Sequence, residues 1–185
     1  VKGPISVSSN NQVFYRNNDD KLNNIWKNPL TGLWEWSNLN NSTNSNVGNS
    51  IAISSDSKVY YKTTDSKLNG IYWNPSSGNW VWSNLNNSVN GNVSGNLHVS
   101  PNGQVFYRTN DQKINNIWLN SSTGNWEWSN LNNSSSNVAG DIMSDNYGKI
   151  FYRTIDSDLN CIYFMNNSWQ WSSLDNAAIN KIKQG

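Results

Sequence analysis

Hydrophobic and polar residues alternate along this chain in short runs, and clusters of Asn, Ser, Asp and Gly separate the runs. Residues 97–100 alternate apolar and polar, and a Pro-Asn-Gly turn signal follows them. Three further runs, 104–108, 114–120 and 125–129, are rich in β-branched and aromatic residues. Alternation with a period of two is typical of strands, and polar turns between such runs indicate hairpins. The pattern therefore predicts four consecutive antiparallel strands.

This unit occurs four times in the chain. A segment of the form Val/Ile-aromatic-Tyr-Arg/Lys begins at positions 13, 59, 105 and 150, which gives a period of 46, 46 and 45 residues. A Trp-X-Trp segment begins at positions 34, 80, 126 and 169, so the last unit is about two residues shorter before its Trp pair. A period in this range is typical of solenoids, propellers and arrays.

Four short strands with tight turns, repeated along a chain, describe the blades of a β-propeller. A β-helix has shorter rungs, leucine-rich repeats lack this aromatic pattern, and the density of Asn, Gly and β-branched residues excludes a helical repeat. We therefore predict an all-β fold, a β-propeller of four-stranded antiparallel blades, with blades at 1–46, 47–92, 93–137 and 138–176. The tail, 177–185, can add a strand or a short helix. A closed four-bladed ring fits this pattern, and so do four blades of a larger ring that more chain or another subunit completes.

The large aromatic residues must supply much of the core. The chain has 11 Trp and 8 Tyr, but only 35% of its residues are hydrophobic and about a fifth are Asn. Side chains two apart on a strand share a face, so Trp126 and Trp128 point the same way. We expect the Trp pairs to pack between neighbouring blades, and the alternative is that one Trp of each pair faces a ligand.

Charge and cysteine content exclude several classes of partner. The formal net charge is +1, without the basic stripe that nucleic acid requires, and no apolar run is long enough to insert into a membrane. Cys161 is the only cysteine, so neither an internal disulfide nor a Cys-rich metal site is possible. We expect Cys161 to be a small buried residue.

The sequence disfavours catalysis. His98 is the only histidine and has no counterpart in the other repeats, which argues against a catalytic triad and against a histidine metal site. The recurring carboxylates are Asp19, Asp65, Asp111 and Asp156, together with Glu35 and Glu127. A catalytic pair needs two unlike environments, whereas these aspartates occupy equivalent turns. We therefore expect no enzymatic activity, no cofactor and no metal.

A binding function fits the repeated polar residues better. Each repeat places a cation, an Asp and an Asn around the turn between its second and third strands, and a Trp on its fourth strand. Sugars offer hydroxyls to such planar partners and an apolar face to an aromatic ring. The candidate ligand residues are Arg16, Asp19, Asn23 and Trp36; Lys62, Asp65, Asn69 and Trp82; Arg108, Asp111, Asn115 and Trp128; and Arg153, Asp156, Asn160 and Trp171. The alternative is an Arg–Asp ion pair that only holds each turn, and the site with Lys62 is expected to be the weaker one because lysine lacks the planar fork.

The internal consensus reads Val-Phe-Tyr-Arg-X-X-Asp-X-Lys-(Leu/Ile)-Asn-Asn-Ile-Trp, followed by Gly-X-Trp-X-Trp-Ser-X-Leu-Asn-Asn. It resembles the repeat of bacterial β-propeller lectins of the Photorhabdus lectin type and, more loosely, the repeats of tectonin and tachylectin-2. The resemblance covers nearly the whole chain and implies a propeller that binds carbohydrate. Lectins of the Photorhabdus type have more blades than the four repeats present here.

Together these observations predict a lectin with several equivalent weak glycan sites between its blades, which acts by multivalent adhesion. Its partners would be extracellular or cell-surface saccharides, and we expect a bacterial protein that acts outside the cell. A homo-oligomer is compatible with this interpretation. The alternative is a propeller module of a larger adhesin or surface assembly that contacts proteins or acts as a spacer. The chain begins at Val1 without a leader, which fits both a removed signal peptide and a piece of a longer protein.

Overall fold

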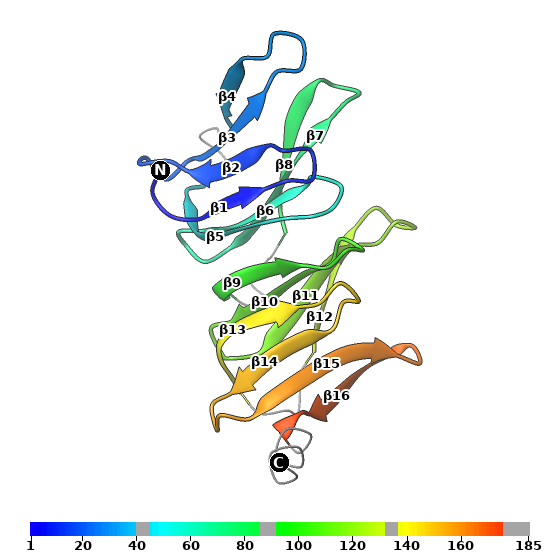
Figure 1. Cartoon of the computed structure of the whole chain (residues 1–185). Helices are drawn as coiled ribbons and strands as arrows, with labels where there is room; N and C mark the ends of the chain where they lie inside the picture. Colours follow the sequence, from blue (N-terminus) through cyan, green and yellow to red (C-terminus); the bar gives the residue numbers. More distant parts are fainter. Residues whose placement is uncertain (40–44, 86–91, 132–136, 176–185) are drawn as a thin grey trace, which may run out of the picture.

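Sixteen strands form four separate antiparallel sheets of four strands each in the computed structural model, which describes residues 1–39, 45–85, 92–131 and 137–175 (Figure 1). The prediction of an all-β fold of four-stranded blades is confirmed. The strands are β1 (Ile5–Val7), β2 (Val13–Arg16), β3 (Leu22–Lys27), β4 (Trp34–Asn38), β5 (Val47–Ile53), β6 (Val59–Thr63), β7 (Leu68–Asn74), β8 (Asn79–Asn84), β9 (Val93–Val99), β10 (Val105–Thr109), β11 (Ile114–Leu119), β12 (Trp126–Asn130), β13 (Val138–Ser144), β14 (Ile150–Thr154), β15 (Leu159–Met165) and β16 (Ser168–Ser173).

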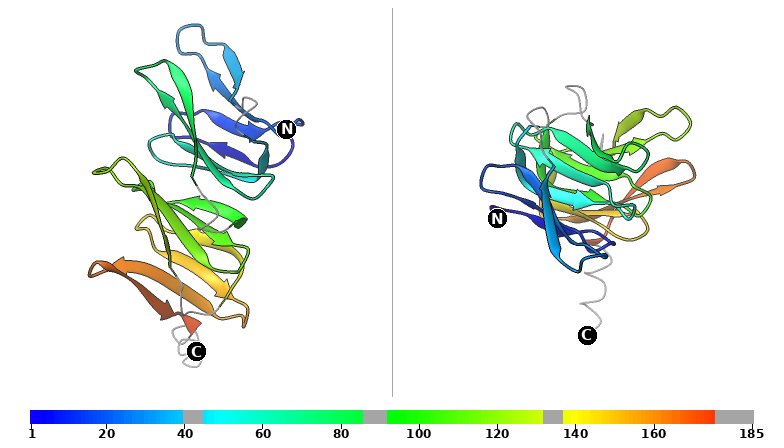
Figure 2. Two further views of the ribbon diagram at one scale, coloured as in Figure 1. Left: turned by 180° about the vertical axis from the view of Figure 1, so that it is seen from behind. Right: turned by 90° about the horizontal axis from the view of Figure 1, so that it is seen from above.

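Each sheet is a simple meander built from one repeat, and we call the sheets blades 1 to 4 in chain order. The first strands of consecutive blades, β1, β5, β9 and β13, pack next to one another. The four blades follow each other in a row, with blade 1 at one end and blade 4 at the other (Figures 1 and 2). The predicted tail, 177–185, lies outside the described residues.

The first turn of each of blades 1 to 3 is closed by a buried serine. In blade 1 the backbone N–H of Gln12 donates to Ser8 Oγ at 3.1 Å, and Lys58 N donates to Ser54 Oγ at 3.1 Å in blade 2. The turn also needs one residue with positive φ, which is Asn11 in blade 1 and Gly103 in blade 3. This requirement explains the Asn-Gly signal in the sequence, because these residue types tolerate left-handed geometry.

Edge-on aromatic contacts hold consecutive blades together. Phe14 of blade 1 meets Trp80 of blade 2, and the same contact recurs between Tyr60 and Trp126 and between Phe106 and Trp169. The ring centroids lie 6.1, 6.3 and 6.0 Å apart at interplanar angles of 82° to 85°, which is the favourable T-shaped arrangement. The first Trp of the pair in blades 2, 3 and 4 thus packs between blades, as predicted.

The second Trp of each pair varies in exposure. Trp82 is partly buried against the first interface, whereas Trp128 and Trp171 are 37% and 50% exposed. Trp36 is 66% exposed on blade 1, which has no preceding blade to cover it. The expectation of packing therefore holds more fully for the first Trp of each pair than for the second.

Each interface joins two unlike faces, which we name by direction. The forward face of a blade looks toward the next blade, and in blade 1 it contributes Phe14, Leu22 and Leu39. The backward face looks toward the preceding blade, and in blade 2 it contributes Val47, Ile51, Val59, Tyr61, Ile71, Trp80 and Trp82. The equivalent residues form the interfaces between blades 2 and 3 and between blades 3 and 4. One apolar interface is therefore built three times within the chain.

Hydrogen bonds repeat across the same three interfaces. The backbone N–H of Val47 donates to Asp20 O at 2.7 Å, and the N–H groups of Val93 and Val138 make the equivalent bonds at 2.8 and 2.9 Å. Each turn that supplies the accepting carbonyl also has a lysine that donates to the segment before the next blade; Lys21 Nζ, for example, lies 2.7 Å from Asn46 Oδ1. These bonds fix the spacing between consecutive blades.

We predict that Phe106→Ala lowers the free energy of unfolding by about 3–5 kcal/mol, because it removes a fully buried ring and its contact with Trp169. Urea unfolding followed by circular dichroism measures the effect. The control is Leu33→Ala, which truncates a 67% exposed side chain and should change stability by less than about 0.5 kcal/mol. Equal losses for the two variants would contradict the interface described above.

Cys161 is 5% exposed on β15, and burial raises the pKa of its thiol. A raised pKa lowers the fraction of reactive thiolate at a given pH, so we expect native protein to react with a thiol reagent at least ~100-fold more slowly than protein unfolded in urea. Because the chain has one cysteine, the label reports on this site alone. Rapid labelling of the native protein would show that β15 is open to solvent.

Candidate functional site

The two ends of each blade carry different chemistry. The turn between the second and third strands lies at one end, which we call the Arg end because Arg16 and its equivalents precede it. The other two turns of the meander lie together at the opposite end, which we call the cleft end. The residues predicted from the sequence as ligands lie on or near the Arg end, except that the Trp residues lie within the fourth strands.

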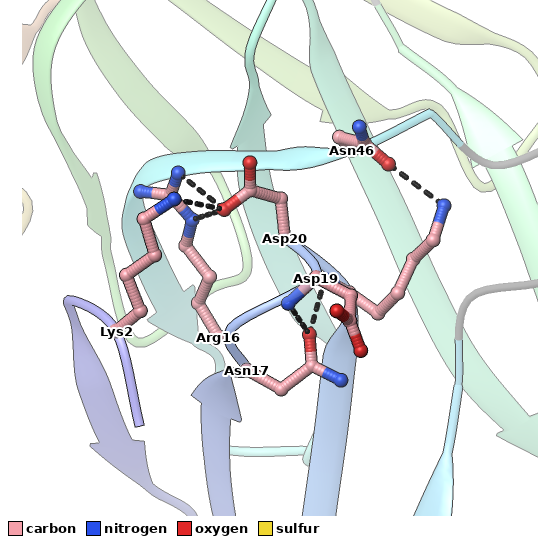
Figure 3. Close-up of polar contacts among 7 residues, drawn as sticks. Lys2, Arg16, Asn17, Asp19, Asp20 and Asn46 are labelled. Carbon is pink, nitrogen blue, oxygen red and sulfur yellow. Dashed lines mark hydrogen bonds and ion pairs between the residues drawn. The ribbon is translucent and has the colours of Figure 1, made fainter.

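At the Arg end of blade 1, Arg16 pairs with Asp20 and not with Asp19 (Figure 3). Arg16 Nη2 and Nε lie 2.6 and 2.8 Å from Asp20 Oδ1, and Lys2 Nζ lies 3.1 Å from the same oxygen. The hydrogen bonds from Lys2 and Arg16 hold the pKa of Asp20 below its ordinary value. Asp19 is exposed, and its backbone N–H donates to Asn17 Oδ1 at 2.9 Å. An ion pair that holds the turn is thus present in blade 1, with the aspartate one position later than predicted.

Among the described residues, the other blades do not repeat this ion pair. Arg108 donates to Val138 O at 3.3 Å and to Ser94 Oγ at 2.9 Å, and Arg153 lies 3.5 Å from Ser157 Oγ. Burial, with a contribution from nearby Arg108, lowers the pKa of Lys62. Asp65, Asp111 and Asp156 are exposed, like Asp19.

The four predicted asparagines lie inside the sheets. Asn23, Asn69, Asn115 and Asn160 are 6%, 1%, 3% and 2% exposed. Each stands opposite a tyrosine on the neighbouring strand; Asn23 Nδ2 donates to Tyr15 Oη at 3.4 Å, and Asn69 bonds Tyr61 in the same way. Burial raises the pKa of Tyr107 to about 12, although its hydrogen bond with Asn115 acts in the opposite direction. Three of these four tyrosines, Tyr61, Tyr107 and Tyr152, pack in the interfaces between blades, so their asparagines support the interfaces. A role for the predicted residues in glycan binding stays a prediction.

The recurring glutamates brace hairpins at the cleft end. Asn28 Nδ2 donates to Glu35 Oε1 at 2.5 Å, and Asn120 Nδ2 donates to Glu127 Oε1 at 2.6 Å.

His98 lies on β9, where burial lowers its pKa and favours the neutral ring. Among the described residues no group of three His, Cys, Asp or Glu side chains is placed to hold a metal ion. No helix within that part of the chain is long and apolar enough to cross a membrane.

In the described part of the chain, a cleft lies at the cleft end between each pair of consecutive blades. Their volumes are about 780 Å³ between blades 1 and 2, about 340 Å³ between blades 2 and 3 and about 450 Å³ between blades 3 and 4. The first turn and third strand of one blade form one wall, and the third and fourth strands of the next blade form much of the other. None of the predicted ligand residues lines them.

The first and third clefts share a row of polar side chains on the wall that the forward face of the preceding blade forms, in blade 1 and blade 3 respectively. In the first cleft Ser37 Oγ donates to Asn24 Oδ1 at 2.5 Å, and Asn24 Nδ2 donates to Gln12 Oε1 at 3.3 Å. In the third cleft the equivalent bonds join Ser129, Asn116 and Gln104 at 2.6 and 3.0 Å. A tryptophan lies beside each row, Trp26 in the first cleft and Trp118 in the third.

Aromatic pairs form the opposite wall of the same two clefts. Trp73 meets Trp80 with ring centroids 5.8 Å apart, and Phe164 meets Trp169 at 5.3 Å. Trp73 and Phe164 are 50% and 58% exposed, so both residues are accessible to solvent. The middle cleft has Leu119 in place of this exposed ring.

The middle cleft also differs in its polar wall, because blade 2 has Lys58 and Gly70 where blades 1 and 3 have Gln and Asn. Lys58 Nζ pairs with Asp56 Oδ2 at 2.9 Å, and among the described residues Asp56 is the only carboxylate that lines any of the three clefts. Burial acts to raise the pKa of Asp56, but the hydrogen bond from Ser54 and the pairing with Lys58 outweigh it and hold that pKa below its ordinary value. Asp56 is therefore ionised at neutral pH.

Sequence reasoning missed these clefts. A recurring signal was present, because Trp26, Tyr72, Trp118 and Tyr163 occupy equivalent positions on the third strands. The next residue along each third strand varies, being Lys27, Trp73, Leu119 or Phe164. Trp73 and Phe164 line the cleft toward the preceding blade and form an aromatic pair there, whereas Leu119 does not. The sequence shows this variation, but only the packing of consecutive blades brings both walls together.

No protein-family model matches the chain, and no curated protein matches it significantly in sequence. Solved structures do match. The β-propeller domain of Cps50 (Swd1) from Myceliophteria thermophila has a TM-score of 0.62 and 11% identity, over 92% of this chain and 60% of that chain. The chain has the β-propeller fold. A second neighbour is the Aleuria aurantia lectin in complex with α-methyl-L-fucoside, with a TM-score of 0.52 and 16% identity over 91% of this chain and 60% of that chain. A third is a Bacteroides uniformis protein provisionally described as a 6-phosphogluconolactonase, with a TM-score of 0.61 and 12% identity over 91% of this chain and 52% of that chain.

These neighbours have different roles, and at such identities the match establishes the fold alone. The chain spans 52% to 60% of the length of the neighbouring chains. A lectin is among the propellers that match, and the resemblance to the Photorhabdus lectin type in particular stays an expectation.

We predict that Asn115→Ala lowers the free energy of unfolding by about 1–3 kcal/mol, because it removes the buried partner of Tyr107. Asn125→Ala, at an exposed position before β12, is the matched control and should change stability by less than about 0.5 kcal/mol. Thermal and urea unfolding measure both. A stable Asn115 variant would argue that this residue is retained for a reason other than folding.

Proposed function

We propose that this propeller binds carbohydrate without chemical conversion, in the first and third clefts between its blades. The observation that carries the proposal is the shared construction of these clefts. Each places an exposed aromatic ring, Trp73 or Phe164, opposite a connected row of amide and hydroxyl groups.

The two walls suit the two kinds of surface on a sugar ring. An aromatic ring covers the apolar C–H face of a pyranose, whereas amides of Asn and Gln both donate to and accept from hydroxyls. The amides are already aligned by their mutual hydrogen bonds, so little side-chain ordering is needed on binding. A few positioned polar groups on an otherwise apolar concave surface are typical of small-ligand sites.

The single carboxylate of the clefts supports binding over hydrolysis. A glycosidase requires two carboxyl groups about 5–10 Å apart, one of which stays protonated to act as an acid. Within the described part of the chain, no second carboxylate lines the clefts beside Asp56, and the lowered pKa of Asp56 keeps it ionised. It therefore suits hydrogen bonding to a hydroxyl better than proton donation.

Two clefts on one rigid body favour multivalent attachment. If each binds a terminal saccharide weakly, simultaneous binding to a glycan-coated surface raises the overall affinity by ~10²–10⁴-fold. This proposal places the protein outside the cell, where glycan-coated surfaces are found, and makes saccharides its partners.

A glycan array probed with densely immobilised protein is the first test, and we expect saccharide hits that a free monosaccharide competes. Calorimetry with the best monosaccharide should then show two sites in the parent protein. Trp73→Ala should weaken one of them by at least ~10-fold, if stacking of a sugar on the ring contributes as much as stacking of a nucleobase, on the order of 1–3 kcal/mol. Trp73→Ala combined with Phe164→Ala should weaken both.

Leu119→Ala is the matched control, because Leu119 holds the same position in the middle cleft, which lacks the aromatic pair. It should leave both sites intact. Trp171→Ala tests the residues predicted from the sequence, since Trp171 lies outside the three clefts. Loss of binding in the Trp171 variant but not in the Trp73 variant would move the site to the sequence-predicted residues, and an array without saccharide hits would reject the function.

A further inference from the structure

The two ends of the row of blades each expose a face that is buried everywhere else in the molecule. At the start of the row it is the backward face of blade 1, where Ile5 on β1 is 57% exposed. Its equivalents Ile51, Leu97 and Ile142 are 7%, 5% and 0% exposed, because a preceding blade covers them. Val7 and Trp34 on the same face are 62% and 65% exposed.

At the other end of the row, the forward face of blade 4 is also exposed. Leu159 on β15 is 46% exposed, whereas its equivalents Leu22, Leu68 and Ile114 are fully buried by the next blade. Met143 on β13 is 65% exposed on the same face. Phe151 is partly exposed, although its equivalents Phe14 and Phe106 are 0% and 1% exposed.

These two faces are the two halves of one interface that the chain already forms three times. Phe151 is equivalent to Phe14, Tyr60 and Phe106, and Trp34 is equivalent to their partners Trp80, Trp126 and Trp169. A forward face of blade 4 placed on a backward face of blade 1 would therefore restore the same edge-on aromatic contact. We propose that a second copy of this chain docks in this way, head to tail, with blade 4 of one copy on blade 1 of the other.

Such a contact is heterologous, so it either closes into a ring or continues into a filament. Two copies joined at both ends give eight blades, which lies within the range of about four to eight blades found in propellers. We commit to the closed pair, because closure leaves neither apolar face exposed. This association does not depend on the proposed glycan binding.

Each junction between copies would also add a cleft of a different kind. In this junction cleft, Tyr163 would lie on the wall formed by the forward face of blade 4. Trp34 would lie on the wall formed by the backward face of blade 1 of the next copy. Lys27 stands where the first and third clefts have Trp73 and Phe164, and Lys149 stands where they have Gln12 and Gln104. The junction cleft would thus lack the aromatic pair and carry two lysines, so we do not expect it to bind the same saccharide.

Sedimentation velocity and light scattering over a wide range of protein concentration test the association. The expected species has twice the 20.9 kDa mass of the chain and does not grow further. Ile5→Glu and Leu159→Glu each place a charge in one half of the junction and should raise the dissociation constant roughly 100-fold or more. Leu30→Glu, in the turn before β4, changes a 93% exposed residue on neither face and should leave the association unchanged.

Mixing the two variants gives the sharpest test. The Ile5 variant keeps an intact forward face on blade 4, and the Leu159 variant keeps an intact backward face on blade 1. A one-to-one mixture should therefore form a heterodimer with a single sound junction, detected with a fluorescent label on one variant, although neither variant associates alone.

Several results would overturn the proposal. They are a parent chain that stays monomeric at every concentration, a Leu159 variant that still pairs while the Ile5 variant does not, and a mixture that shows no heterodimer. Circular dichroism confirms that each variant is folded. A monomeric parent whose Leu159 variant loses thermal stability would show that the chain itself covers this face, which also rejects docking of a second copy.

Discussion

The edge-on contact between an aromatic residue of one blade and the first Trp of the next is the interaction on which this structure depends. A four-stranded sheet has two faces, and both faces of these blades carry apolar side chains, so a single blade cannot bury its own core. Phe14 with Trp80, and the two equivalent pairs, supply large apolar area in a fixed geometry at each interface. Because every blade contacts only its neighbours, stability accumulates along the row in the manner of a repeat protein.

The clefts are a consequence of the same stacking. The tryptophan that joins two blades also forms part of a cleft wall, since Trp80 and Trp169 each line a cleft. Packing fixes this ring, so function can vary only at the positions around it. Blade 2 shows such variation, because Gly70 and Lys58 interrupt the polar row that blades 1 and 3 share. Near-identical repeats can therefore carry unlike sites while their interfaces stay the same.

The period, the strands and the packing role of the first Trp could be predicted from the sequence, because each follows from local alternation and repetition. The partner of Arg16 could not, since Asp20 has positive φ and the turn carries its side chain back toward the arginine. Strand pairing places Asn23 opposite Tyr15 on the backward face of blade 1, and Asn23 is only 6% exposed although no preceding blade covers that face. The alternation of residues along the strand does not reveal this burial. The clefts were missed because each is assembled from residues almost 50 positions apart, such as Gln12 and Lys58.

The pairing of a forward face with a backward face has a consequence for the history of such chains. Because the two faces are complementary in every repeat, tandem duplication of one gene segment adds a blade without requiring any new surface. Deletion of a segment is tolerated for the same reason. The number of blades can thus drift between related genes while the contacts inside each protein remain unchanged.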